Sequence, residues 1–147
     1  MRLRALCLLF VLFLPSSIMG QDHDTHQWRL IVKSLSGNNY YIDQDSLIRT
    51  DYNTARAWYK IVPVKEGSLF DRLRNIRFFG VIMADTNYYK LYCEIDCMRK
   101  YIKTLITTAY SKEGKIIRRE ETLDSKWTKI PDQSSFDMIR DIVCGLK

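Results

Sequence analysis

Three of the four cysteines in this 147-residue chain, Cys93, Cys97 and Cys144, are candidates for a chemical role. A thiol can form a disulfide, attack a substrate or bind a metal. Leu91, Cys93, Ile95 and Cys97 occupy every second position of one run, so they share one face of a predicted half-buried strand. Residues four apart in a strand lie about 13 Å apart, well beyond the roughly 7 Å between Cα atoms that a disulfide permits. The spacing therefore predicts that one of these two cysteines joins Cys144 and that the other is left as a free thiol.

A metal or redox role for the same thiols has weaker support. Zinc would need Cys93, Cys97, Cys144 and a histidine at one ion, but a strand with three residues between its cysteines does not bring them together. A dithiol redox site usually has the spacing Cys-x-x-Cys, which the chain lacks. We therefore expect no metal site and no cofactor.

The two histidines, His23 and His26, both precede the first expected strand and lie in a polar leader, residues 21–27. A serine or cysteine nucleophile activated by histidine would have to take its base from a mobile tail, so we expect both histidines to be solvated. We predict no catalytic residue and no enzymatic activity.

Glu94 and Asp96 share one face of the cysteine strand and could form an acid pair. We favour the interpretation that they belong to a solvated or lysine-paired face, next to Lys90.

Three clusters of basic residues, with tyrosines near them in sequence, could bind an anionic or protein ligand. The clusters are Arg72, Arg74 and Arg77; Arg99, Lys100 and Lys103; and Arg118 with Arg119, and the tyrosines are Tyr88, Tyr89 and Tyr92. The first two clusters form the candidate ligand surface. Such runs are usually solvated faces, and export argues against nucleic acid as the partner, whereas contact with polyanions such as glycosaminoglycans stays open.

Residues 1–20 have the composition of a secretory signal peptide. Arg2 and Arg4 precede an apolar run from Ala5 to Leu14, and a proline with small residues leads to Gly20, after which we expect cleavage. The run is about ten residues long, whereas a span needs about twenty, so we expect no membrane span after processing. The run also lacks the pattern of a lipid attachment site, so periplasmic, secreted and surface locations all stay open.

Loss of the two arginines in residues 1–20 lowers the formal net charge from +6 to +4 for residues 21–147. This mild basic bias suits anionic partners but identifies none. Residues 21–147 have the size of one domain, enough for one sheet and a covering helix. An oxidising compartment favours a structural disulfide over a catalytic thiol.

Alternating runs separated by turn-forming clusters predict about six strands. We expect six of them at 28–33, 40–43, 55–62, around Cys93, at 101–108 and at 116–122, and a last short strand at 127–130. Residues 46–49 are expected to be extended. Residues 64–75 form a short helical turn or a long loop, and residues 76–83 an extra strand or a loop packed on the sheet.

A helix is expected over 134–143, with Ser134 as N-cap and Asp137 at the third helical position. Its apolar stripe would consist of Phe136, Ile139, Ile142, Val143 and Leu146. A regular helix would point Cys144 away from this stripe, whereas an end that unwinds at Gly145 would bring the thiol inward. Together the elements predict an α+β fold, a meandering antiparallel sheet with one C-terminal helix across a face.

Several motifs occur in a distinctive order: Trp28; Tyr41-Ile42-Asp43 with Ser46 and Arg49; Trp58 with Lys60; Glu94-Ile95-Asp96-Cys97; Tyr110 with Gly114; Trp127 with Ile130-Pro131; and Cys144. In this order they resemble the surface-adhesin protein E family of small exported bacterial proteins. The resemblance implies a sheet whose C-terminal helix is tethered by a disulfide between Cys97 and Cys144, which makes Cys93 the free thiol.

The resemblance also implies a function. Family members named as adhesins are displayed on the outer surface, often through a lipid anchor, and bind host extracellular-matrix proteins; this chain departs from them in lacking an acylation cysteine. We expect an exported, non-enzymatic binding protein with a protein ligand. The alternative is a periplasmic or envelope-associated structural domain with no extracellular ligand.

Overall fold

The computed structural model of the chain describes residues 26–35, 37–63 and 86–145. The expected signal peptide and the segments 64–75 and 76–83 lie outside these residues. The described elements are β1 (Trp28–Lys33), β2 (Asn39–Asp43), the 3-10 turn η1 (Gln44–Ser46), β3 (Ile48–Arg49), β4 (Thr54–Val62), β5 (Tyr88–Asp96), β6 (Tyr101–Tyr110), β7 (Ile116–Glu121), β8 (Thr128–Lys129) and α2 (Ser135–Val143).

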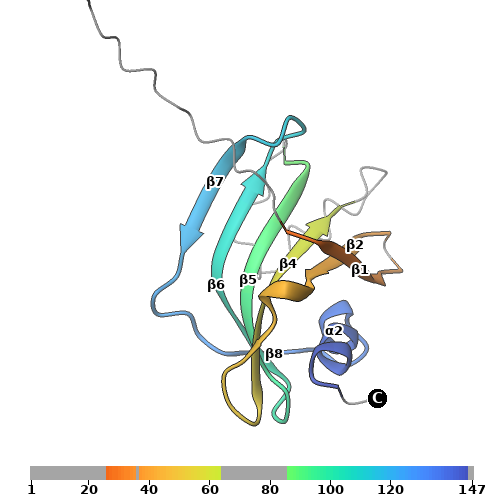
Figure 1. Cartoon of the computed structure of the whole chain (residues 1–147), viewed down its shortest axis with the longest axis vertical. Coiled ribbons are helices and arrows are strands. Elements are labelled where there is room, and N and C mark those ends of the chain that lie inside the picture. The colour runs from red at the N-terminus through yellow and green to blue at the C-terminus, as the bar shows by residue number, and fades with distance from the viewer. Residues whose placement is uncertain (1–25, 36, 64–85, 146–147) are drawn as a thin grey trace, which may run out of the picture.

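The strands form one antiparallel sheet in the order β1-β2-β4-β5-β6-β7 (Figure 1). Two short strands join it from the side: β3 pairs with β4, and β8 pairs with β6. Antiparallel neighbours can be joined by tight turns, which is why strands that follow one another in sequence also pair in space. The predicted meander of six main strands followed by one helix is confirmed.

Residues 46–49 are not wholly extended as expected, because Ser46 belongs to η1. The Asp43 carboxylate accepts a hydrogen bond from the Asp45 N–H at 3.3 Å, and the Ser46 hydroxyl donates to the Asp43 carbonyl oxygen at 2.7 Å. Such local bonds from short polar side chains compete with strand pairing. β3 is therefore left with two residues.

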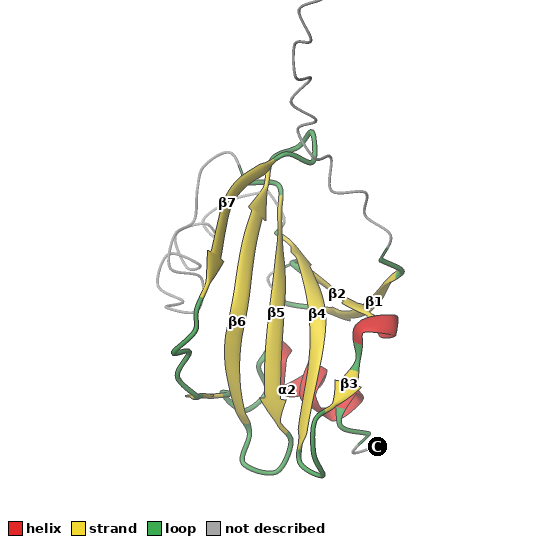
Figure 2. Ribbon diagram, turned by 60° about the vertical axis from the view of Figure 1, so that its left-hand side comes forward, coloured by secondary structure: helices red, strands yellow, loops and turns green. Residues whose placement is uncertain are grey.

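The core lies on one face of the sheet, where the residues alternate as predicted. Leu91, Cys93 and Ile95 of β5 are each at most 1% exposed. The same side of β4 contributes Ala55, Ala57, Tyr59 and Ile61, all buried. α2 covers this face, and Figure 2 shows it behind the strands.

Helix α2 begins as the sequence predicted. The Ser134 hydroxyl accepts a hydrogen bond from the Asp137 N–H at 3.2 Å, and the Asp137 carboxylate accepts one from the Gln133 N–H at 3.0 Å. Ile139 and Val143 are buried in the core. The helix start therefore has the reciprocal bonding of a capping box, shifted by one residue.

Ile142 was wrongly assigned to the buried stripe, since it is 42% exposed. The buried side of α2 includes Ile139, Val143 and also Arg140. At roughly 100° per residue, Ile142 lies about 110° from the middle of that side. Leu146, also assigned to the stripe, lies outside the described residues.

The implied disulfide between Cys97 and Cys144 is present, with 5.8 Å between the Cα atoms. α2 ends at Val143, and Gly145 takes a positive φ of 67°, so the chain unwinds at the residue that the sequence suggested. Cys93 is a free, buried thiol. The tether therefore fastens the end of α2 to the residue that follows β5.

Candidate functional site

Glu94 and Asp96 do not form an acid pair, in line with the favoured interpretation. The Glu94 carboxylate is buried and lies 3.1 Å from the Arg56 guanidinium and 2.9 Å from the Lys103 ammonium group. Asp96 instead bonds to the turn after β5. Glu94 is thus a structural carboxylate paired with a lysine, as one of the two expected alternatives had it, and also with Arg56.

His26 is not a solvated leader residue, contrary to expectation. Its Nδ1 lies 2.5 Å from the buried Asp43 carboxylate, and its ring centroid lies 5.4 Å from that of Trp28 and 6.3 Å from that of Trp58. The nearby Ser46 hydroxyl donates to a backbone carbonyl and accepts the Trp58 N–H. This serine is therefore bonded to backbone and is not aligned with His26 as a nucleophile. His23 lies outside the described residues.

The basic residues predicted as one ligand surface are separated in space. Lys100 lies 2.8 Å from the Asp132 carboxylate and 3.6 Å from that of Asp137, which ties β6 to the start of α2. The hydrogen bond with Asp132 raises the pKa of Lys100. Lys103 pairs with Glu94, and only Arg99, with a side chain 81% exposed, extends from the surface. The cluster Arg72, Arg74 and Arg77 lies outside the described residues.

Arg99 borders a cavity of about 390 Å³ between two turns. One turn joins β3 to β4 and the other joins β5 to β6, and Figures 1 and 2 show them side by side at one end of the sheet. We call this region the two-turn site; its lining residues are Asp51, Tyr52, Asn53, Thr54, Asp96, Met98 and Arg99.

Both turns are held in shape by an aspartate. Asp51 accepts the N–H groups of Asn53 and Thr54 at 2.7 and 2.8 Å. The bond from Asn53 is the main reason that the pKa of Asp51 is lowered. Asp96 accepts the N–H groups of Met98 and Arg99 at 3.1 and 2.8 Å. Side-chain bonds of this kind fix a turn, so the two-turn site is preorganised.

The side chains at the tips of the turns project into solvent. Tyr52 is fully exposed and Met98 is 70% exposed. Tyr, Met and Arg are enriched in protein interfaces, and Tyr and Arg dominate binding hot spots. A rigid frame that presents Tyr52, Met98 and Arg99 around one cavity can bind a protein surface.

A second group of aromatic and basic residues lies on the sheet face opposite α2. The Nζ of Lys60 lies 5.6 Å from the Trp28 ring centroid and 4.8 Å from that of Tyr88. The Nζ of Lys90 lies 5.7 Å from the Trp28 centroid and 4.9 Å from that of Tyr110. Tyr88 and Tyr110 stack at 4.7 Å. These five residues, the aromatic–lysine cluster, form a closed ring of contacts.

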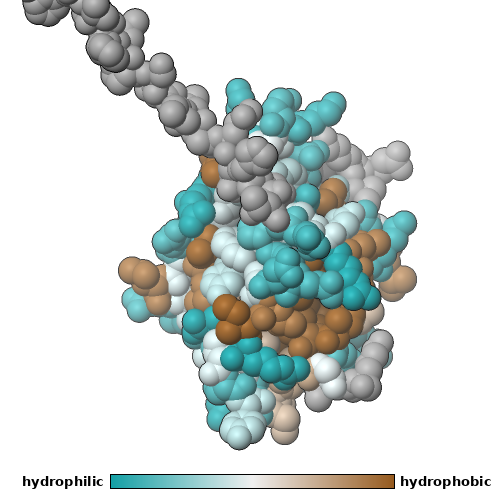
Figure 3. All heavy atoms as spheres, viewed as in Figure 1, coloured by the Kyte–Doolittle hydropathy of each residue, from teal (hydrophilic) through white to brown (hydrophobic). Residues whose placement is uncertain are grey.

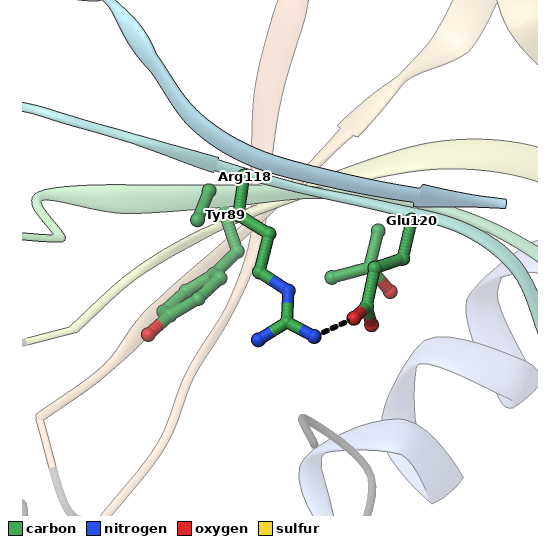
Figure 4. A pocket seen from close by; sticks show the side chains of 5 residues that line it. Tyr89, Arg118 and Glu120 are labelled. Carbon is green, nitrogen blue, oxygen red and sulfur yellow. Dashed lines mark hydrogen bonds and ion pairs between the residues drawn. The ribbon is translucent and has the colours of Figure 1, made fainter. Parts of the chain in front are cut away.

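Two other surface features do not form a site. A hollow of about 10 Å³, lined by Tyr89, Thr107, Ala109, Arg118 and Glu120, has room for about one water molecule. Figure 4 shows its lining side chains from close by. In Figure 3, apolar atoms gather around the place where Figure 1 draws η1 and α2, and the exposed apolar residues of that region include Leu47, Ile48 and Ile142. No charge or turn in this patch specifies a ligand.

Within the described ranges, no group of three or more histidine, cysteine or acidic side chains is placed to hold a metal ion. The same residues include no helix with the length and apolarity needed to cross a membrane.

Tyr52 and Met98 are not among the site residues predicted from the sequence. Tyr52 lies between the turn-forming residues Asp51 and Asn53, and an aromatic residue in such a place was the available signal, because nothing local buries it. Met98 carries no comparable signal, since its position is defined by the turn that follows Asp96.

Comparison with known proteins gives one family and one fold. The family model described as surface-adhesin protein E matches residues 28–145. No curated protein matches the chain. A structure of Haemophilus influenzae protein E in crystal form II is similar, with a TM-score of 0.51 and 13% identity, over 81% of this chain and 87% of that chain. Another structure of the same protein has a TM-score of 0.50 and 13% identity, over 81% and 84%. At this identity the likeness shows the fold alone.

Proposed function

Because the chain belongs to the surface-adhesin protein E family, we propose that it is an exported, non-enzymatic protein that binds a protein ligand through the two-turn site. The expected signal peptide at 1–20 supports export. The single observation that carries the choice of site is the preorganised pair of turns with Tyr52, Met98 and Arg99 exposed at their tips.

Preorganisation matters because flexible loops lose conformational freedom when they bind. Here the Asp51 and Asp96 side chains and the Cys97 tether hold both turns, so less of the interaction energy is spent on ordering them. Extracellular-matrix proteins are the proposed ligand class, by analogy with the adhesins of the family. Polyanions are a second proposed class of contact.

Binding of the purified protein to a panel of immobilised extracellular-matrix proteins tests this function. Tyr52→Ala is expected to weaken binding of a matching ligand by roughly tenfold, the loss typical of one hot-spot side chain. Leu123→Ala is the matched control, because Leu123 is 96% exposed in the loop between β7 and β8. Equal affinities of the two variants would contradict the site.

Protease treatment of intact cells tests the location. Digestion before the outer membrane is permeabilised would support display at the surface. Protection until permeabilisation would rule out the adhesin function and favour the alternative, a periplasmic or envelope-associated domain.

A further inference from the structure

Strand β7 forms one outer edge of the sheet, and its side chains are largely exposed. It pairs with β6 on one side, and in the described part of the chain no strand pairs with its other side (Figure 1). Five of its six residues are exposed, and Ile117 is only half-buried. An edge strand presents backbone groups with which the strand of another chain can pair. The outer side of β7 is therefore open to a further strand.

The backbone of β7 has hydrogen-bonding groups that point away from β6. The N–H of Thr122 donates a hydrogen bond of 2.8 Å to the Leu105 carbonyl oxygen, so the backbone of Thr122 faces β6. Successive residues of an antiparallel strand face the neighbouring strand and turn away from it alternately. The backbone of Glu120 therefore also faces β6, whereas the N–H and C=O groups of Arg119 and Glu121 face outward.

The charges of β7 complement those of a second copy of the same strand. The run Arg118-Arg119-Glu120-Glu121 has two positive charges followed by two negative ones. On one face, Arg119 lies 2.7 Å from the Glu121 carboxylate. On the other face, Arg118 pairs with Glu120, as Figure 4 shows. An edge with charges of one sign would repel its copy, whereas these four residues carry both signs equally.

We propose that two copies of the chain associate through their β7 strands, paired antiparallel about a twofold axis at Glu120. In this register Arg119 of each copy lies opposite Glu121 of the other. Each of these two pairs can exchange two backbone hydrogen bonds, because the groups concerned face outward. The side chains form ion pairs between the copies as well as within each strand, so four charges of alternating sign meet on one face. On the other face, Arg118 lies beside each Glu120 and offsets the repulsion between the two carboxylates at the axis.

A second copy fits this edge better than an unrelated strand does. An unrelated strand would need an acidic residue opposite Arg119 and a basic residue opposite Glu121, whereas a copy supplies both by symmetry. Pairing of one short strand buries less surface than the standard interface of about 1,600 Å², so we expect a dimer that dissociates on dilution. The dimer does not involve the two-turn site, whose residues belong to other turns. It is therefore independent of the proposed function.

Sedimentation velocity of the protein without residues 1–20, from micromolar to millimolar concentration, tests the proposal. The unaltered protein should change from monomer to dimer over this range. Arg119→Glu places like charges opposite each other at two points of the interface and should raise the dissociation constant of the dimer by about tenfold or more. Glu121→Arg should have the same effect. The matched control is Lys112→Glu, an equal change of charge at an exposed residue of the β6–β7 turn, which should alter the dissociation constant by no more than about twofold.

An equal mixture of the Arg119→Glu and Glu121→Arg proteins separates strand pairing from a general effect of charge. In a mixed dimer, the introduced glutamate lies opposite the introduced arginine, and the two unchanged residues also face each other. The mixture should therefore associate about as tightly as the unaltered protein, although neither variant does so alone. Thermal melting verifies that each variant folds, and if one does not, the concentration series of the other decides.

Tyr52→Ala should leave the association unchanged, whereas it should weaken binding to a matrix protein, so the two proposals can fail separately. Three results would overturn the proposed dimer. The unaltered protein could stay monomeric at every concentration, its dimer could be insensitive to both charge substitutions, or the mixture of folded variants could stay monomeric.

Discussion

The backbone N–H of Cys97 donates a hydrogen bond of 2.7 Å to the carbonyl oxygen of Asn53. This bond joins the β5–β6 turn to the β3–β4 turn, and the Cys97 side chain joins the same point to the end of α2 through Cys144. One residue thus connects both halves of the two-turn site to the last helix.

Loss of the disulfide is expected to lower the free energy of unfolding far more than loss of the free thiol. Cys144→Ser opens a covalent loop with a sequence separation of 47 residues, and the chain-entropy model gives a loss of about 4 kcal/mol in the free energy of unfolding for a loop of this length. Cys93→Ser should cost much less, because it changes only one buried atom. Denaturant unfolding of both variants measures the difference, and equal losses would contradict this assignment.

The turn after β5 should depend on the oxygen atom of Asp96. Asp96→Ala leaves the N–H groups of Met98 and Arg99 without their acceptor, so we expect a loss of about 1 kcal/mol in the free energy of unfolding and weaker binding at the two-turn site. Asp96→Asn keeps a side-chain carbonyl oxygen and should retain most of both properties. Thermal melts and binding to a matrix protein check this; an Asn variant as impaired as the Ala variant would argue against the role of the oxygen.

The Cys93 thiol should not react with thiol reagents in the folded protein. Burial raises the pKa of its thiol to about 12, so very little of the reactive thiolate is present at pH 8. A chromogenic disulfide reagent should detect no thiol in the native protein at pH 8 and one thiol per chain after denaturation, in protein that lacks residues 1–20. Rapid reaction of the native protein would show that the β5 core opens easily.

The contact between Lys100 and Asp132 should stabilise the fold only over a limited pH range. The hydrogen bond to Lys100 lowers the pKa of Asp132 below 3.8, so this contribution is lost as pH falls through the lowered value. The pKa of Lys100 is raised above 10.5 by the same bond, so the contribution is also lost as pH rises through the raised value. Asp132→Asn should therefore lower the melting temperature at pH 7, where both groups are charged, and have little effect at pH 2. A difference that persists at pH 2 would point to a cause other than charge.

Much of the fold could be predicted from local patterns. The alternation of Leu91, Cys93, Ile95 and Cys97 is visible in sequence, and all four residues lie in the core. Lys90 and Glu94, on the other face of β5, are buried as well, which the alternation did not predict. The Ser134 cap was predictable because its hydrogen bond spans three residues. The prediction for Ile142 was wrong because the predicted apolar stripe was too wide. The buried side of α2 consists of Ile139, Arg140 and Val143.

The candidate site was much less predictable, because it depends on contacts between distant residues. Arg99, Lys100 and Lys103 are close together in sequence, yet the turn and the strand alternation point them in different directions. Arg99 lines the two-turn site, Lys100 pairs with Asp132, and Lys103 pairs with Glu94. His26 looked like part of a mobile leader, but it packs between Trp28 and Trp58.

The strands, their meandering order and the start of the helix follow from the amino-acid order alone, since periodicity, turns and caps act over a few residues. The tertiary structure decided which turn residues share a cavity, and placed Lys60 opposite Lys90. It also brought Cys97 within bonding distance of Cys144. These relationships depend on strand register and on the position of α2 over the sheet, which are set by packing between segments far apart in the chain.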